Sequence, residues 1–185
     1  IDLLSVSGHK VCAPKGVGAL YVKKGARIAP ILYGGGQQNG LRSGTESVPL
    51  IAAFGAAAEK GRTGLGENRA HYEMLRALLL QEAASVPQIR FRDVSHHAPH
   101  IVSFSVYGVR SETMLHYLEQ FAVYVSSGSA CAKGKHSYVL SALGVDKMTS
   151  DETLRVSFAP DTADEMIREL VRRVAQGAQS LVKQR

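Results

Sequence analysis

The chain has 185 residues, of which 45% are hydrophobic and 21% charged, and its formal net charge is +6. These values are ordinary for a soluble globular protein of one or two domains. Aromatic residues make up only 6% of the chain and Trp is absent, which argues against the basic, aromatic-rich surface of a nucleic-acid-binding protein. The basic residues instead indicate a solvated surface, and docking of an acidic protein partner is the second interpretation.

The two cysteines, Cys12 and Cys131, lie far apart in the sequence and do not predict a disulfide framework. No apolar run reaches membrane-spanning length, and the first residues lack the basic and apolar regions of a secretion signal. We therefore predict free thiols in a reducing cytoplasm, without a membrane or direct nucleic-acid partner. The chain starts without Met inside a predicted strand, which indicates a processed or shortened protein.

The first half of the chain is expected to contain two strands followed by two helices. Short apolar runs bounded by Gly and Pro are typical of strands, whereas Ala-rich and amphipathic runs are typical of helices. This predicts strands at 1–6 and 18–24, a Gly-rich loop at 32–47, and helices at 47–60 and 67–86 separated by a Gly-rich string at 61–66. Ser47 is a suitable cap for the first helix, and Pro87 ends the second.

The second half alternates strands and helices. Its predicted elements are strands at 88–94, 100–108, 122–128 and 152–159, and helices at 111–121, 137–144 and 162–184. Thr162 and Glu165 form a capping-box pattern at the start of the last helix. The alternation predicts a small α/β domain. We therefore expect an α/β protein with one segment at 1–86 and a small C-terminal domain at 87–185.

The string SGHK places Lys10 in a loop of small residues directly after a predicted strand. A lysine that forms a Schiff base needs a fixed position and a deprotonated amine. Ser7, His9 and the backbone N–H of Gly8 are donors of the kind that bind a phosphate group. On composition alone, a surface lysine on a glycine-rich turn is the better interpretation.

Cys131 follows a predicted strand in the string SSGSACAKGKH. The nearby Lys133, Lys135 and His136 make this loop electropositive, and such a loop favours the thiolate, which is the nucleophilic form of cysteine. A buried structural cysteine is the alternative, because most free cysteines are buried. The small polar neighbours argue against burial, so we favour a reactive thiol.

Two further candidates are able to bind anions. The string RSGT, which ends at Thr45, precedes a predicted helix, where backbone N–H groups attract anions. A helix cap with a basic neighbour is the alternative for this string. Arg155 is flanked by apolar residues on a predicted strand and is able to hold a carboxylate through two hydrogen bonds. Its alternative role is that of a solvent-exposed residue on an edge strand.

In their order and spacing these motifs resemble those of the cysteine desulfurases, which are pyridoxal 5'-phosphate (PLP) enzymes of the class V aminotransferase group with the fold-type-I architecture. The resemblance rests on SGHK, PKGVGALYV, GGGQQNGLRSGT, SSGSAC and LRVSF, and it runs over essentially the whole chain. SSGSAC resembles the group that serves iron–sulfur cluster assembly and tRNA thiolation.

The resemblance implies that residues 1–86 are the end of the large PLP-binding domain. Lys10 matches the lysine that forms the Schiff base with PLP, and Ser7 and His9 match residues that bind the PLP phosphate. Thr45 matches the threonine that reaches the PLP phosphate of the other subunit in a homodimer. No metal site is implied.

The resemblance also implies the chemistry of the small domain. Cys131 matches the nucleophile that takes sulfur from L-cysteine, leaving L-alanine and an enzyme persulfide that passes to an acceptor protein. Arg155 matches the arginine that holds the substrate carboxylate. Two departures concern Ala13, where the family usually has Gly, and the segment after Cys131, which is shorter than usual. We interpret Cys12, which matches no catalytic position, as a packed thiol.

Two alternatives remain beside a desulfurase. The resemblance covers only the C-terminal part of such an enzyme, whose preceding part supplies the aromatic residue and the acid that contact the PLP ring. The 185-residue chain alone is therefore alternatively a catalytically incompetent module that retains the small domain and a partner surface. A selenocysteine lyase or another class V enzyme is less favoured, because an aminotransferase needs no cysteine in the SSGSAC string.

Overall fold

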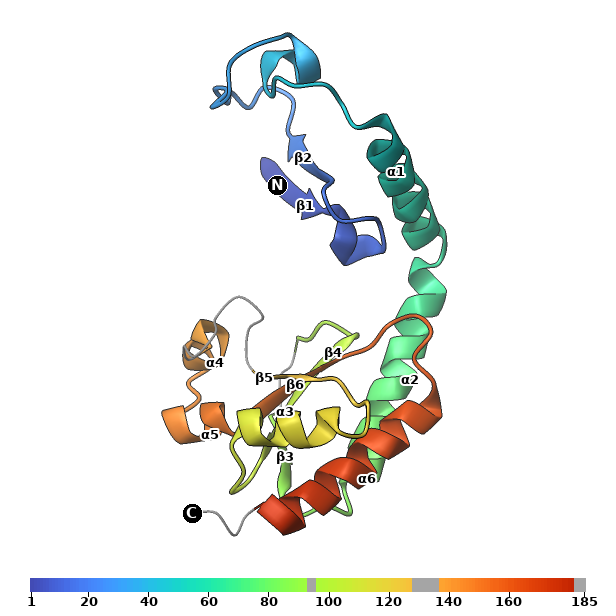
Figure 1. Cartoon of the computed structure of the whole chain (residues 1–185), viewed down its shortest axis with the longest axis vertical. Coiled ribbons are helices and arrows are strands. Elements are labelled where there is room, and N and C mark those ends of the chain that lie inside the picture. The colour runs from blue at the N-terminus through green and yellow to red at the C-terminus, as the bar shows by residue number, and fades with distance from the viewer. Residues whose placement is uncertain (93–95, 128–136, 182–185) are drawn as a thin grey trace. The chain divides into compact units, whose positions relative to one another are not determined.

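The chain divides into two units, unit 1 (Ile1–Gly66) and unit 2 (Glu67–Arg185). The computed structural model, drawn in Figure 1, describes residues 1–92, 96–127 and 137–181. Both units combine helices with antiparallel strands, so the predicted α/β class is confirmed. No helix within these described ranges is long and apolar enough to cross a membrane.

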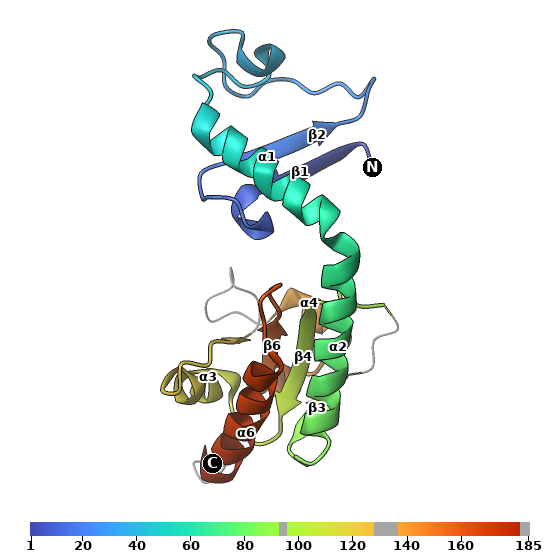
Figure 2. The same cartoon turned by 90° about the vertical axis from the view of Figure 1, so that its right-hand side faces the viewer.

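Unit 1 consists of a strand hairpin, two short 3₁₀ helices and one long helix. In chain order they are β1 (Leu3–Ser7), η1 (Gly8–Val11), β2 (Gly18–Val22), η2 (Gln37–Gly40) and α1 (Val48–Thr63). The strands pair antiparallel, with Ser7 opposite Gly18, and α1 contacts η1, as Figure 2 shows from the side. The predicted strands at 1–6 and 18–24 and the predicted helix at 47–60 are confirmed, whereas η1 and η2 lie in segments that were predicted as loops. The predicted break at 61–66 is wrong in extent, because Gly61 is accommodated inside α1 and the break is confined to Gly64.

Unit 1, which the structure describes throughout, has no buried hydrophobic side chain. Its large exposed apolar residues include Leu3, Leu20, Tyr21, Ile31 and Tyr33. Strand pairing and turn hydrogen bonds hold the backbone instead, such as the bond of 2.8 Å from the Lys23 N–H to the Asp2 carbonyl. The local shape of unit 1 therefore depends on backbone hydrogen bonds and glycine-rich turns rather than on a core of its own.

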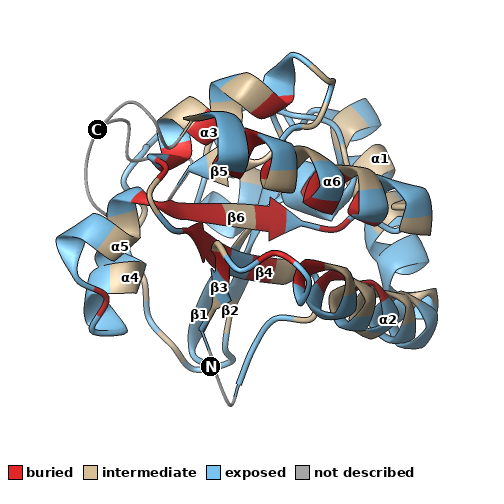
Figure 3. Ribbon diagram, turned by 90° about the horizontal axis from the view of Figure 1, so that it is seen from below, coloured by how far each residue is buried: buried red, intermediate tan, exposed pale blue. Residues whose placement is uncertain are grey.

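Unit 2 is built on a four-stranded antiparallel sheet with the strand order β3–β4–β6–β5. In chain order, the elements after α1 are α2 (Leu65–Ala83), β3 (Ile89–Phe91), β4 (Ile101–Val106), α3 (Ser111–Glu119), β5 (Ser126–Ser127), α4 (Tyr138–Ala142), α5 (Lys147–Asp151), β6 (Thr153–Ser157) and α6 (Asp164–Leu181). Helices α2, α3 and α6 pack on one face of the sheet and enclose the core. Figure 3 shows the buried residues gathered on β4, β6 and the sides of these helices.

The strands β4 and β6 divide their side chains between this core and a polar face. The core residues of β4 are Val102, Phe104 and Val106. Because successive strand residues point to opposite faces, Ser103 and Ser105 lie on the other face. Ser103 stands opposite Arg155 of β6, and Ser105 stands opposite Thr153. The sheet therefore has one apolar face and one face that presents hydroxyl and guanidinium groups.

The boundary between the two units differs from the predicted boundary after residue 86. Helix α2 was assigned to the first segment, but Leu75 and Leu79 are fully buried in the core of unit 2. A helix belongs to the unit in which its apolar stripe is buried, so the units meet at Gly66 and Glu67. The assignment of 1–86 to a PLP-binding domain stays a prediction.

Two short elements also differ from the sequence-based expectation. Among the described residues of the strand expected at 122–128, only Ser126–Ser127 form a strand. Ala122, at the start of that segment, adopts a left-handed conformation with φ 56°, which is incompatible with a strand. Helix α5 was not expected, since its sequence KMTSD has a single apolar residue, Met148, and so shows no apolar periodicity. Its cap is Asp146, whose carboxylate accepts bonds of 2.9 Å and 2.6 Å from the N–H and hydroxyl of Thr149. These bonds lower the pKa of Asp146, the hydroxyl having the larger effect.

Replacing Phe104 by Ala tests the two-faced sheet. The Phe104 side chain is 2% exposed and lies 5.6 Å from the ring of Phe91. We expect Phe104→Ala to lower the free energy of unfolding by about 3–5 kcal/mol, because it leaves a cavity in the core. The adjacent control Ser103→Ala, on the polar face, should change it by less than about 0.5 kcal/mol. Urea unfolding followed by circular dichroism measures both, and similar effects of the two changes would contradict the assignment of faces.

Candidate functional site

The η1 turn holds Lys10 at a defined place directly after β1. Ser7, the last residue of β1, has extended backbone angles, and Gly8 begins the turn. The Gly8 N–H donates to the Val17 carbonyl at 2.9 Å, and the Gly8 carbonyl accepts from the Ala13 N–H at 3.0 Å. The turn is thus fixed on both sides of Gly8, while the side chain of Lys10 is exposed.

Gly8 is required in this turn because no side chain fits there. A Cβ atom at Gly8 would lie 2.9 Å from both the Cγ1 atom and the carbonyl oxygen of Val17. The turn ends at Cys12, whose left-handed backbone (φ 66°) lets its N–H donate to the Gly8 carbonyl. Cys12 is exposed, so the interpretation of this residue as a packed thiol is wrong. Unit 1 offers no core in which its side chain could be buried.

Thr45 lies in a separate loop of unit 1, between η2 and α1, and is exposed. The loop is held to the preceding segment by bonds from the Gly44 N–H to Gln37 Oε1 at 3.2 Å and from the Ser43 hydroxyl to the Leu32 carbonyl at 3.4 Å. These bonds fix the RSGT string as a surface loop that leads into α1. Ser7, His9 and Lys10 are brought together by one turn, whereas Thr45 reaches the surface from this second loop.

Arg155 lies on the polar face of unit 2 and is partly buried. Its Nη2 donates to the Ser126 hydroxyl at 3.2 Å, across the pairing of β6 with β5. Its Nε is buried and has no hydrogen-bond partner among the described residues. A buried donor without an acceptor costs about 1–3 kcal/mol, and more when it is charged. This guanidinium is therefore suited to bind a carboxylate ligand, whose two oxygens accept hydrogen bonds from it in the matching geometry.

Ser126 is a candidate site residue that the sequence alone did not single out. It is the first residue of the SSGSAC string, and it stands opposite Arg155 in the sheet. The string itself was the available signal, but the strand register that joins these two residues cannot be read from their spacing. Cys131 lies outside the described residues, as do Lys133 and its basic neighbours. The described residues contain no group of three or more His, Cys, Asp or Glu side chains that is arranged to hold a metal ion.

The sequence model of the class-V aminotransferases matches residues 1–170. The chain belongs to the class-V aminotransferase family. Among proteins similar to this class-V aminotransferase chain, the cysteine desulfurase IscS of Clostridium botulinum is 37% identical over 173 residues, which cover 90% of this chain and 44% of that protein.

Solved structures agree with this family assignment. A NifS-like protein superposes with a TM-score of 0.87 at 30% identity, covering 97% of this chain and 47% of that one. A structure described as SspA in complex with cysteine superposes with a TM-score of 0.62 at 26% identity, covering 88% of this chain and 45% of that one. The predicted resemblance to cysteine desulfurases is confirmed at the level of family and fold, and the chain spans less than half the length of these relatives.

The requirement for Gly8 in this class-V aminotransferase turn is testable by amide hydrogen exchange. We expect Gly8→Ala to speed exchange at residue 8 and Ala13 by about tenfold or more, because overpacking displaces the turn. The control is Gly61→Ala, since a Cβ at Gly61 of α1 meets no atom within 4 Å. Unchanged exchange in Gly8→Ala, or equal effects of the two substitutions, would show that the turn tolerates a side chain.

Proposed function

We propose that the protein carrying this chain is a PLP-dependent cysteine desulfurase, which removes sulfur from L-cysteine and releases L-alanine. The observation that carries the proposal is the partly buried guanidinium of Arg155, whose Nε has no partner among the described residues. It is a carboxylate site in a chain similar to proteins named as cysteine desulfurases. The choice of a desulfurase over another class-V enzyme rests on Cys131 in the SSGSAC string.

The residues of unit 1 fit PLP. The Lys10 amine is exposed and makes no ion pair or hydrogen bond to another described residue, so it is free for a covalent link to the cofactor. Ser7 and His9 flank the glycine turn with a hydroxyl and an imidazole for the phosphate. Thr45, on its exposed loop, is proposed to reach the phosphate of the other subunit in a homodimer. When bound, PLP supplies an electron sink that weakens the bonds at the substrate Cα.

In this mechanism Arg155 holds the carboxylate of L-cysteine, and Ser126 keeps the guanidinium in place through the bond to Nη2. The Nζ of Lys10 moves a proton at the substrate Cα. The thiolate of Cys131 attacks the substrate sulfur, so that an S–S bond forms and the C–S bond breaks with its electron pair left on carbon. Protonation of that carbon gives L-alanine, and no external oxidant or reductant is needed.

The persulfide on Cys131 is then passed to an acceptor protein for iron–sulfur cluster or thio-cofactor synthesis. A persulfide requires a cysteine that is not already in a disulfide, which agrees with the expected reducing compartment. The cytoplasmic location itself stays a prediction from the sequence. SSGSAC supports a sulfur-transfer role but names no acceptor.

A second candidate applies to the 185-residue chain by itself. Unit 2 has an extensive core, whereas unit 1 buries no hydrophobic side chain. This contrast supports the alternative in which the isolated chain is catalytically incompetent. In that case unit 2 is a folded module with a partner surface, and unit 1 does not bind PLP stably. The two candidates differ in whether added PLP gives this chain a visible absorption band that depends on Lys10.

Lys10→Ala tests the cofactor assignment. In the full-length protein that carries this chain, we expect the variant to lose the visible absorption band of protein-linked PLP and its desulfurase activity, because no other group makes the covalent link. The control Lys24→Ala removes another exposed lysine, just after β2, and should keep the band. A band that persists after Lys10→Ala would remove this residue from its proposed role.

Steady-state kinetics test the roles of Arg155 and Ser126. Arg155→Lys should raise the KM for L-cysteine by at least about tenfold, because lysine loses the two-point grip on the carboxylate. Ser126→Ala should raise KM by roughly 2- to 10-fold with kcat little changed, as loss of one hydrogen bond predicts, and Ser126→Thr should restore KM.

Ser103→Ala is the matched control, because Ser103 stands opposite Arg155 on its other side but, within the part of the chain that the structure describes, makes no hydrogen bond to it. An effect of Ser126→Ala on kcat alone, or an equal rise in KM in Ser103→Ala, would contradict a positioning role for Ser126.

A further inference from the structure

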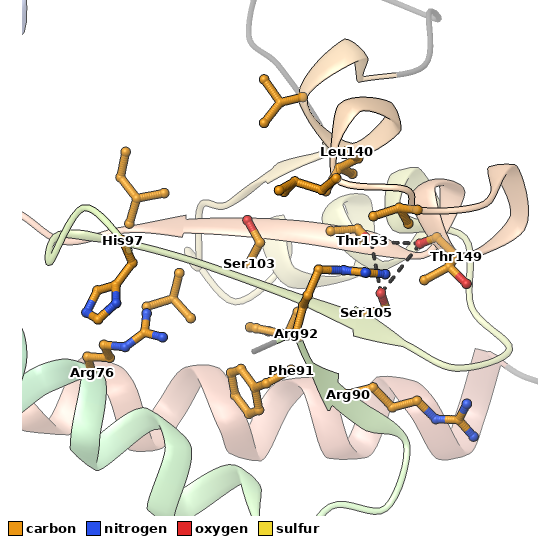
Figure 4. A pocket seen from close by; sticks show the side chains of 16 residues that line it. Arg76, Arg90, Phe91, Arg92, His97, Ser103, Ser105, Leu140, Thr149 and Thr153 are labelled. Atoms are coloured by element: carbon orange, nitrogen blue, oxygen red, sulfur yellow. Dashed lines mark hydrogen bonds between the residues drawn. The ribbon is translucent and has the colours of Figure 1, made fainter. Parts of the chain in front are cut away.

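A pocket of about 140 Å³ lies on the polar side of the unit 2 sheet, apart from the residues assigned to PLP and substrate. Its basic lining residues are Arg76 of α2, Arg90 of β3, Arg92 and His97. None of the described lining residues is Asp or Glu. Figure 4 shows the Arg92 side chain beside Ser105 and Thr149, and Arg76 close to His97 at the other end.

Two of these arginines are free to bind a ligand. Arg90 is already engaged, since its guanidinium lies 4.5 Å from the centre of the Tyr107 ring. Arg76 and Arg92 have no ion pair or hydrogen bond to another described residue. The nearby carboxylate of Glu73 lies 3.4 Å from His97 Nε2, and so faces the histidine. Within the part of the chain that the structure describes, the pocket thus contains two guanidinium groups without a partner.

The other walls determine what these arginines can bind. The Thr153 hydroxyl donates to the Thr149 carbonyl at 2.7 Å, and the Ser105 hydroxyl lies 2.9 Å from the Thr153 hydroxyl. These two hydroxyl groups bond to one another, so among the described lining residues the guanidinium groups are the charged donors left for a ligand, and the Ser103 hydroxyl is a neutral donor beside them. The opposite wall is apolar and includes Val139 and Leu143 around α4, each 48% exposed.

The size of the pocket excludes a large ligand. Pockets for small molecules typically measure about 300–1,000 Å³, so a cavity of about 140 Å³ accommodates a side chain or a small anion. The exposed Val139 and Leu143 favour a side chain that comes with an apolar neighbour, because a free inorganic anion gains nothing from them. The pocket also continues the polar face that holds Arg155. Ser103 and Ser105 of β4 both line the pocket, and Ser103 stands opposite Arg155 in the sheet.

We propose that this pocket binds an acidic segment of a partner protein. A carboxylate side chain of the segment pairs with Arg92 and Arg76, and an adjacent apolar side chain packs against Val139 and Leu143. Charge complementarity gives such an interface its orientation and much of its specificity. If the protein is a desulfurase, as proposed above, this partner is the sulfur acceptor. The binding of an acidic segment follows from the lining of the pocket alone and does not depend on the proposed function.

The test is a titration of the ¹⁵N-labelled 185-residue chain with the peptide acetyl-GLEELG-amide, followed by NMR. We expect the peptide to shift the amide signals of Ser103, Ser105 and Leu140. Arg92→Gln should weaken binding by about tenfold or more, because the charge-assisted pair is lost. The matched control Arg69→Gln removes an exposed arginine of α2 outside the pocket and should change affinity by less than about twofold.

Two altered probes separate the parts of the proposal. The peptide acetyl-GLQQLG-amide tests the carboxylates, and acetyl-GGEEGG-amide tests the apolar neighbour; both should bind at least about fivefold more weakly. Arg76→Gln provides a second variant if Arg92→Gln loses its dispersed spectrum.

Three results would overturn the proposal. They are no shifts in the presence of millimolar peptide, equal weakening by Arg69→Gln, and inorganic phosphate that binds as tightly as acetyl-GLEELG-amide and displaces it. The titration requires neither PLP nor turnover. A failure of peptide binding would therefore not contradict the desulfurase proposal. Likewise, evidence against desulfurase activity would not contradict peptide binding in the pocket.

Discussion

One-sided burial of the unit 2 sheet is the constraint on which the rest of this unit depends. Its apolar face must be removed from water, and α2, α3 and α6 do so around Phe104 and Leu154. Because neighbouring strand residues point to opposite faces, the burial of Leu154 forces Arg155 onto the polar face. The same alternation gathers Ser103 and Ser126 beside Arg155. The proposed substrate site and the basic pocket are both consequences of this packing.

Unit 1 positions its candidate residues by a different principle. It buries no hydrophobic side chain, and the location of Lys10 depends on the hydrogen bonds of Gly8 with Val17 and Ala13. Such a turn is precise in backbone geometry but has little packing to stabilise it. In the proposed desulfurase, the cofactor residues therefore rely on close backbone approach, whereas Arg155 relies on a packed sheet.

The elements with strong local signals were predictable from the sequence, including the two strands on either side of the Lys10 loop, the long helices and the α/β class. The boundary after residue 86 was not, because the apolar stripe of α2 shows that the helix is buried but not in which unit. Helix α5 shows no apolar periodicity, although Asp146 followed by Thr149 is a capping pattern. The bond between Ser126 and Arg155 and the pocket around Arg92 depend on strand register and on segments distant in sequence, which no local pattern encodes.

The transfer of sulfur from L-cysteine onto Cys131 is the proposed step on which the desulfurase function of this family member depends. Its most direct test is mass spectrometry of the full-length protein that carries this chain, alkylated after incubation with PLP and L-cysteine and digested under non-reducing conditions. The account predicts one additional sulfur atom on the peptide that contains Cys131, lost on reduction, and none on the peptide that contains Cys12. An unmodified Cys131 in a protein that converts L-cysteine to L-alanine, or extra sulfur on Cys12 alone, would contradict it.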